Sequence, residues 1–343
     1  DGLVALAQRL AGGSARETQP DQVISTARQR FVVPDRSGLP GLAQYARLVA
    51  GPGDQRLAGY TEASRGCKHL CRHCPVVPVY NGRFRIVPRE VVLADIDRQV
   101  EAGARHITFG DPDFLNGPRH ALALLDELHQ RFPTLTYDVT VKVEHLLRHA
   151  ALLPTLKQTG CLFITSAVES LDDAVLARLA KGHTRSDVEA VVRLFEHVGL
   201  ALAPTFVTFT PWTTPASYFD LLETLVEWNL VEHVAPIQYA IRLLIPAASR
   251  LLELPEVREL VAPFDREALA YPWAHPDPRM DALYEAVREI VKTASPHDDR
   301  RSVFSRVWQA AQAAAGHGAR PPAWCTGFAP QTPIPFISEG WYC

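Results

Sequence analysis

Three cysteines within eight positions are the residues of this sequence best suited to chemistry. Cys67, Cys71 and Cys74 are separated by three and two residues, so one tight loop brings three thiolates together. Such soft ligands suit either zinc or an iron–sulfur cluster. A structural zinc site would take a fourth ligand from His69, His73 or a distant cysteine. Three ligands without a fourth would instead leave one iron of a [4Fe–4S] cluster open to an exogenous group.

The composition places these thiols in an ordinary globular protein. The chain has 343 residues, of which 47% are hydrophobic and 21% charged, enough to build a large core. Its formal net charge of −3 gives no electrostatic footprint for nucleic acid. The sequence lacks both a run of 18 apolar residues and a signal-peptide pattern, so we expect no membrane span and a cytoplasmic location. Clustered cysteines also favour metal ligation in a reducing compartment over a disulfide framework.

Short apolar runs alternate with helix-sized segments, and this rhythm predicts repeated βα units around a parallel sheet. Right-handed crossovers curl such a sheet into an α/β fold, a partial (β/α)6 TIM-like barrel. The cysteine loop would follow the first strand and lie at the mouth formed by the carboxyl ends of the strands. The predicted strands are residues 56–60, 106–109, 135–141, 161–165, 201–207 and 234–238. The predicted helices are 88–103, 118–131, 144–158, two stretches between 171 and 197, and 215–228.

Gly and Pro residues and changes in composition divide the chain into four predicted parts. Residues 1–55 contain several Gly and Pro breakers and are predicted to be a lead-in. Residues 56–245 form the barrel core, and residues 246–320 form a helical extension. Residues 321–343, rich in Pro, Gly and aromatic residues, are expected to be an irregular tail that contains cysteines.

The segment Ser64-Arg-Gly-Cys67-Lys-His-Leu-Cys71-Arg-His-Cys74-Pro75 resembles the radical S-adenosylmethionine (SAM) superfamily. The resemblance covers about residues 56–240. It implies a [4Fe–4S] cluster whose open iron is chelated by SAM, and reductive cleavage of SAM to a 5′-deoxyadenosyl radical in a closed, dry site. It also implies an electron donor such as flavodoxin or ferredoxin. A small-molecule substrate is favoured because no macromolecule-binding module or basic patch is visible.

The resemblance assigns several residues to SAM. His73 takes the place of an aromatic residue near adenine. The turn Phe109-Gly110-Asp111-Pro112-Asp113 matches one that binds the SAM amino group, although the usual Gly pair is missing. Both aspartates qualify for this role, and both could instead be turn and helix-cap residues.

Later strands contribute further candidates. Ser166 and Glu169 match a segment that contacts the ribose or methionyl part of SAM, and a buried Glu needs some partner. Lys142 could pair with the SAM carboxylate or the substrate, or be a solvated rim residue. Gln238 closes the sixth strand as a possible ligand contact. His106 and Cys161 are expected to be structural.

The segment Pro335-Phe-Ile-Ser-Glu-Gly-Trp-Tyr-Cys343 resembles the approach to the tail of the CCAEP-tail radical SAM proteins. The second Cys and the Ala-Glu-Pro of that tail are absent here, and the resemblance implies that the natural chain continues. Cys343, together with Cys325, could act on a substrate that contains sulfur, selenium or arsenic. Both residues could also be inert, Cys325 as a small buried hydrophobe.

Two other functions stay open at this point. One is a zinc-binding or iron–sulfur redox or structural protein without SAM chemistry, which would show zinc on metal analysis. The other is a radical SAM enzyme that modifies nucleic acid, which would show salt-dependent binding.

Overall fold

The computed structural model describes residues 11, 30–294, 299–316 and 334–338, and the fold is built by those from Phe31 onward. Within them, one curved sheet has the strand order β8-β7-β6-β5-β2-β1-β9. The five strands from β2 to β8 in this order are parallel to their neighbours, whereas β1 is antiparallel to both β2 and β9. The strands are β1 Arg47–Gly51, β2 Asp54–Thr61, β5 His106–Phe109, β6 Thr136–Thr140, β7 Cys161–Glu169, β8 Ala201–Phe206 and β9 Phe336–Ile337.

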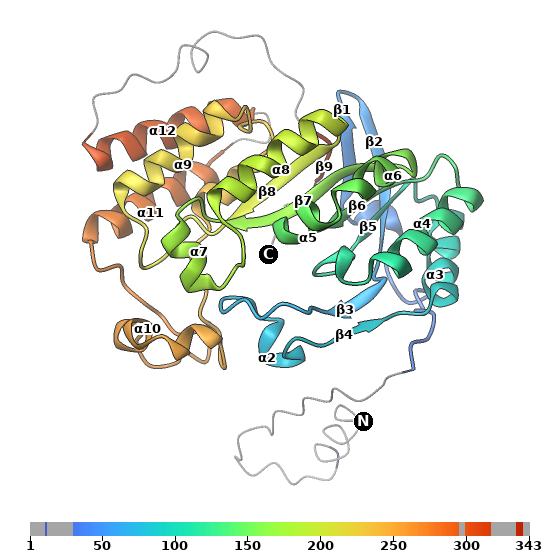
Figure 1. Ribbon diagram of the computed structural model, residues 1–343, viewed down its shortest axis with the longest axis horizontal. Coiled ribbons are helices and arrows are strands. Elements are labelled where there is room, and N and C mark those ends of the chain that lie inside the picture. Colours follow the sequence, from blue (N-terminus) through green and yellow to red (C-terminus); the bar gives the residue numbers. More distant parts are fainter. Residues whose placement is uncertain (1–10, 12–29, 295–298, 317–333, 339–343) are drawn as a thin grey trace. The chain divides into compact units, whose positions relative to one another are not determined.

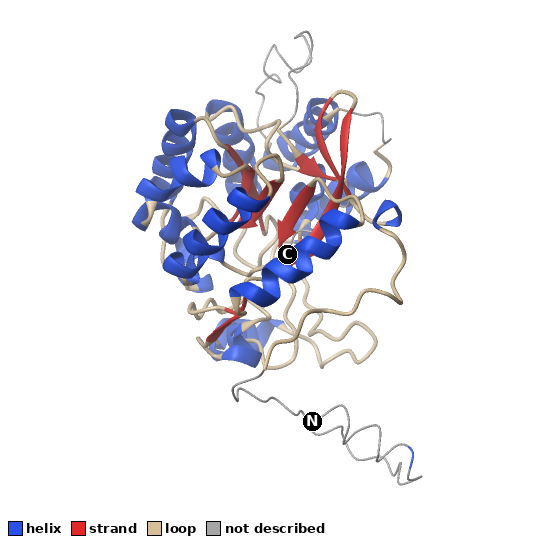
Figure 2. Ribbon diagram, turned by 90° about the vertical axis from the view of Figure 1, so that its right-hand side faces the viewer, coloured by secondary structure: helices blue, strands red, loops and turns tan. Residues whose placement is uncertain are grey.

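Helices lie along the outside of this sheet, and Figures 1 and 2 show the strands enclosed between them. Local sequence sets several of their ends. Thr184 and Asp187 form a capping box at the start of α8, and Gly199 ends this helix in the left-handed conformation with φ 66°. The helices are α3 Arg89–Glu101, α4 Pro118–Arg131, α5 Val143–Arg148, α6 Leu153–Gln158, α7 Asp173–Leu179, α8 Arg185–Val198, α9 Pro215–Glu227, α10 Pro255–Leu260, α11 Pro278–Lys292 and α12 Arg300–Ala315. Short 3-10 helices are η1 Leu42–Gln44, η2 Phe114–Asn116, η3 Ala150–Leu152, η4 Pro236–Ala240 and η5 Arg250–Glu253.

A separate two-stranded excursion carries the cysteine loop. It comprises β3 (Ser64–Gly66), the short helix α2 (Val77–Tyr80) and β4 (Phe84–Ile86), with β3 antiparallel to β4. In Figure 1 this light-blue excursion lies beyond the carboxyl ends of the parallel strands. The excursion is fastened there by a backbone bond from Val87 N to the Ala63 carbonyl, 2.9 Å long.

The predicted βα order is confirmed, with strands and helices at most of the expected positions. The prediction of a sixth strand at 234–238 is wrong, because this segment leads into the 3-10 helix η4. Pro236 lacks the N–H that a strand would donate. The side-chain oxygen of Gln238 instead accepts a hydrogen bond from Phe206 N at 2.8 Å. This bond gives a backbone N–H at the edge of β8 the acceptor that a neighbouring strand would have supplied. Backbone pairing resumes only at the isolated bridge between Phe209 and Arg242.

Three other boundaries differ from the prediction. The single helix expected at 144–158 is divided into α5, η3 and α6, with Pro154 in the first turn of the last piece. The lead-in 1–55 supplies β1 to the main sheet, and the irregular tail 321–343 supplies β9. Among the described residues, no helix is both long and apolar enough to cross a membrane.

Candidate functional site

The three cysteines lie on the loop between β3 and α2. All three thiols are free; Cys71 is buried, and Cys67 and Cys74 are partly buried. Gly66 precedes the loop with φ 79°, and a Cβ there would collide with the Arg83 carbonyl and the Tyr80 ring. This glycine therefore lets the chain turn sharply into the cysteine loop.

Burial keeps the metal-free thiols of Cys67 and Cys74 protonated. It raises the pKa of the Cys67 thiol and raises that of Cys74 to about 11, against opposing hydrogen bonds from backbone N–H groups. The neighbouring Asn116 side chain acts in the opposite direction to burial and lowers the pKa of Cys67. Positive charge is needed to stabilise the thiolates here, and a bound metal would supply it.

The end of β7 holds a buried ion-pair network against the loop. Glu169 Oε1 lies 3.1 Å from His73 Nε2 and 3.2 Å from Lys181 Nζ, and both Glu169 and Lys181 are buried. Burial alone would raise the pKa of Glu169, but Lys181 and His73 outweigh it and lower this pKa to about 2. Glu169 adopts φ 68°, a left-handed conformation that is uncommon for a non-glycine residue. The network thus fixes the ring of His73, the residue just before Cys74.

The turn after β5 contains the predicted Gly110, Asp111 and Asp113. Asp111 uses both oxygens within the fold, accepting from Ala63 N at 2.8 Å and from Ser64 Oγ at 2.6 Å. Its side chain is buried, and this burial raises its pKa to about 6 despite those hydrogen bonds. A Cβ at Gly110 would collide with the Tyr60 hydroxyl. Asp111 therefore joins the cysteine excursion to the barrel, and Gly110 leaves the space that the Tyr60 ring occupies.

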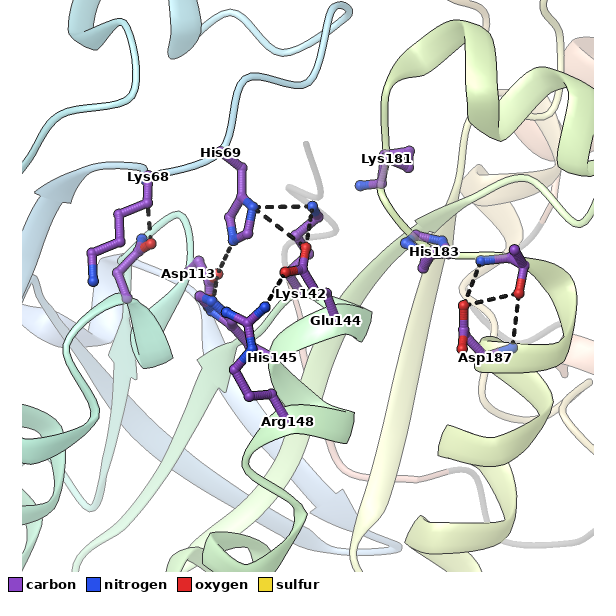
Figure 3. A network of polar contacts seen from close by, with 12 residues as sticks. Lys68, His69, Asp113, Lys142, Glu144, His145, Arg148, Lys181, His183 and Asp187 are labelled. Carbon is purple, nitrogen blue, oxygen red and sulfur yellow. Dashed lines mark hydrogen bonds and ion pairs between the residues drawn. The ribbon is translucent and has the colours of Figure 1, made fainter.

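Asp113 belongs to a second polar network, which Figure 3 shows beside the loop. Its Oδ2 lies 2.7 Å from His145 Nδ1 and 3.5 Å from His69 Nε2. The other nitrogen of His69 lies 3.1 Å from Lys142 Nζ, and Lys142 pairs with Glu144 at 3.2 Å. Lys142 is buried and is not a solvated rim residue. The carboxyl ends of β5 and β6 thus place two acids, a lysine and a histidine around His69 of the cysteine loop.

A cavity of about 210 Å³ opens at the carboxyl ends of β7 and β8. Its lining includes Glu169, Thr208 and Ser217. Ser166, on β7, is fully buried, and its hydroxyl has no hydrogen-bond partner among the described residues. Gln238 does not join the cavity, since its side chain caps β8 and lines a smaller cavity beside Phe336.

The remaining cysteines fall into two groups. Cys161 is buried in β7, with its thiol directed to the Phe163 carbonyl at 3.4 Å. His106, likewise predicted to be structural, is buried and lies 2.8 Å from Asp138. Cys325 and Cys343 lie outside the described residues.

Comparison with known proteins identifies the domain that carries this site. The sequence profile of the Radical SAM superfamily matches residues 61–215. Residues 61–215 are a radical SAM domain. The resemblance to the radical SAM superfamily and the fold expected from it are therefore confirmed, whereas the resemblance to the CCAEP-tail proteins stays a prediction.

Characterised relatives of this radical SAM domain are distant. The chain is 25% identical over 202 residues to a tRNA-2-methylthio-N(6)-dimethylallyladenosine synthase of Fusobacterium nucleatum, covering 52% of this chain and 43% of the relative. It is 24% identical over 131 residues to the hopanoid C-2 methylase of Rhodopseudomonas palustris, covering 37% of this chain and 25% of the relative. The chain thus spans less than half the length of these relatives.

Solved structures show the same fold at low identity. The cobalamin-dependent SAM radical enzyme OxsB, solved with aqua-cobalamin and SAM, matches with a TM-score of 0.55 at 16% identity, over 75% of this chain and 46% of that one. The radical SAM methyltransferase TsrM of Kitasatospora setae matches with a TM-score of 0.53 at 18% identity, over 79% and 58% of the two chains. These likenesses concern the fold alone.

Sequence reasoning missed several residues of the radical SAM domain that surround the cysteine loop. Glu144 and His145 follow Lys142 by two and three positions. Glu144 was expected beside Lys142 at the mouth end of the third strand, without an assigned role, and the same position was a usable signal for His145. Lys181 and His183 come from a loop between α7 and α8, and reach the site only because Ala180 and Gly182 both adopt positive φ. No spacing rule shows that a loop will fold back in this way.

Proposed function

We propose that this chain is a radical SAM enzyme in which Cys67, Cys71 and Cys74 hold a [4Fe–4S] cluster. The observation that carries the proposal is the set of three free thiols on one loop, held at the carboxyl-end mouth of a curved parallel sheet. The matched radical SAM profile and the SAM-binding OxsB structure support it.

The residues present fit such a cluster. Three soft donors are close enough in the chain to bind one cluster, and burial makes the thiolates of Cys67 and Cys74 dependent on metal charge. Glu169 engages Nε2 of His73, so only its Nδ1 could serve as a fourth ligand. The neighbouring amide of Asn116 can donate to Cys67 and tune the cluster. With SAM bound, such a cluster supplies the electron that cleaves the sulfonium.

The chain's own residues would hold SAM around this loop. Asp113 is the better partner for the SAM amino group, since its Oδ2 accepts no hydrogen bond from the described residues, whereas both oxygens of Asp111 do accept one. We assign the buried, unpartnered hydroxyl of Ser166 to the nucleoside or methionyl part. Glu169 acts through His73, fixing the orientation of its ring. Lys142 stays a candidate for a carboxylate of SAM or of the substrate.

The proposed substrate is a small molecule, possible classes being sulfur, selenium or arsenic compounds. Support comes from the 210 Å³ cavity and from the direction of β9, which runs parallel to the barrel strands toward the mouth. Cys343 follows Ser338 by five residues, a length that spans at most about 17 Å. Cys325 and Cys343 are therefore kept as candidate reactive thiols. Modification of tRNA is the alternative, and it is favoured by the similarity to the tRNA-2-methylthio-N(6)-dimethylallyladenosine synthase.

The proposed electron donor is an acidic one-electron carrier. Residues 65–89, which include the cysteine loop, contain lysine and arginine but no aspartate or glutamate, a local charge that the near-neutral total conceals. Arg65, Arg72 and Arg89 pair with glutamates outside the segment. Lys68 is exposed next to Cys67, and its ammonium lies 4.7 Å from the centre of the Phe84 ring. A negatively charged carrier would be attracted to this segment.

The test is anaerobic reconstitution of the full chain with iron and sulfide, followed by iron counting and titration with SAM. We expect about four irons per chain, absorbance near 400 nm, and saturable SAM binding that disappears in Cys74→Ser. A chain that binds zinc in the three-cysteine loop and no iron–sulfur cluster would contradict the proposal.

A further inference from the structure

A second set of metal donors shares one residue with the three-cysteine set. Donor atoms of Cys67, His69 and Asp113 all lie within 4.8 Å of one another. The first two come from the loop after β3, and the third comes from the turn after β5. We propose that the cluster-free chain binds one zinc ion through these three side chains, a site distinct from the three-cysteine set.

The geometry suits a tetrahedral ion. Zinc accepts thiolate, imidazole and carboxylate ligands at about 2.0–2.3 Å, so neighbouring ligand atoms lie about 3.4 Å apart. The distance from His69 Nε2 to Asp113 Oδ2 is 3.5 Å, close to this edge length. An ion placed between these atoms would need only small movements of the Cys67 thiol, leaving the fourth position to water.

Asp113 is arranged so that one oxygen faces this position. Its Oδ1 accepts from Leu115 N at 3.3 Å, at the start of η2, and fixes the carboxylate. Its Oδ2 faces His69 and His145, and the carboxylate is 1% exposed. A buried carboxylate held between two histidines is a strong site for a cation. His145, at 2.7 Å from Oδ2, would orient this ligand or replace the water.

The second nitrogen of His69 lies beside Lys142 and Glu144. Its Nδ1 is 3.1 Å from Lys142 Nζ and 3.7 Å from Glu144 Oε2. Because an ammonium can only donate, Nδ1 accepts from Lys142 and the ring proton is on Nε2, facing Asp113. Zinc binding to Nε2 would move this proton to Nδ1, so Lys142 would have to withdraw while the Glu144 carboxylate approaches to accept it.

Because Cys67 is shared, zinc and the proposed cluster exclude each other; this consequence rests on the proposed function. The zinc site itself does not. Cys71 and Cys74 belong to the cluster set alone, whereas His69 and Asp113 belong to the zinc set alone. The two sites therefore respond to different substitutions.

The experiment titrates the metal-free, reduced full chain with zinc against a chromophoric chelator. We expect one zinc per chain, with affinity lowered about tenfold or more in His69→Gln and Asp113→Asn. Cys71→Ser is the matched control, since it removes a neighbouring thiol of the same loop and should leave zinc affinity within twofold. Iron–sulfur reconstitution should show the opposite pattern, failing in Cys71→Ser and succeeding in His69→Gln.

Three results would overturn the zinc site. They are an unaltered chain that binds less than one zinc ion, an equal loss of zinc affinity in Cys71→Ser and His69→Gln, and an unchanged zinc affinity in Asp113→Asn. Circular dichroism checks that each variant is folded. If a variant is not folded, cobalt is added to the unaltered chain instead. The intensity of the thiolate-to-cobalt charge-transfer band then shows whether one thiolate or three bind the metal. Failure of reconstitution in every chain, with zinc binding intact, would reject the cluster and leave the zinc site standing.

Discussion

The buried network at the end of β7 makes a quantitative prediction for Glu169→Gln. This substitution keeps the shape of the side chain and removes its charge, which leaves the Lys181 ammonium buried without a carboxylate. The pKa of Glu169 is about 2 in the folded chain, against an ordinary value of 4.5. At pH 7 this difference corresponds to about 3 kcal/mol of folding free energy. Loss of one partner of a buried ion pair costs a similar amount, about 3–5 kcal/mol.

The sign of the pH dependence follows from the lowered pKa. The carboxylate stabilises the fold fully above pH 4.5, and this contribution disappears as the pH falls toward 2. Urea unfolding of the unaltered chain and of Glu169→Gln should therefore differ by about 3 kcal/mol at pH 7, and by progressively less below pH 4.5.

Two variants provide the controls. Glu189→Gln removes an exposed partner of Arg193 on α8, and should cost less than about 0.5 kcal/mol. The double variant Glu169→Gln/Lys181→Met removes both buried charges and should recover much of the lost stability. A loss below 1 kcal/mol in Glu169→Gln, or a loss that does not change with pH, would refute this reasoning.

Three further predictions concern the loop and its attachment. Cys71→Ser should abolish iron–sulfur reconstitution, whereas Cys161→Ala, which alters a thiol inside β7, should retain it; equal iron content in both would reject the assigned ligands. Gly66→Ala should destabilise the chain by about 1–3 kcal/mol, because a left-handed residue gains a Cβ against backbone, while Gly51→Ala meets open space and should change little in thermal unfolding. The raised pKa of Asp111 opposes folding as the pH rises from 3.8 through about 6, so Asp111→Asn should flatten the stability profile in that window; an unchanged urea profile would contradict this.

The sequence predicted the barrel well where local signals act alone. Helix α4 begins at Pro118 and strand β5 begins at His106, as the apolar rhythm and the prolines indicate. The prediction from sequence failed at the sixth strand, where a side chain takes the place of backbone pairing. Gln238 supplies the acceptor for Phe206 N that a sixth strand would have supplied, and nothing in the local pattern shows this substitution.

The candidate site divides in the same way. The cysteines were evident from spacing, because ligands on one loop are encoded locally. The partners of the loop come from the ends of several strands, and their pairing depends on tertiary geometry. Asp111 and Asp113 look equivalent in sequence, yet one joins the excursion to the barrel and the other faces two histidines.

The measurement that tests the central claim most directly is SAM turnover by the anaerobically reconstituted chain with dithionite as reductant. Liquid chromatography with mass spectrometry would follow 5′-deoxyadenosine and other SAM cleavage products. The account predicts a cleavage product in amounts that depend on reductant, and none from Cys71→Ser. A chain that carries its full complement of iron and sulfide, binds SAM, and still releases no cleavage product would contradict it.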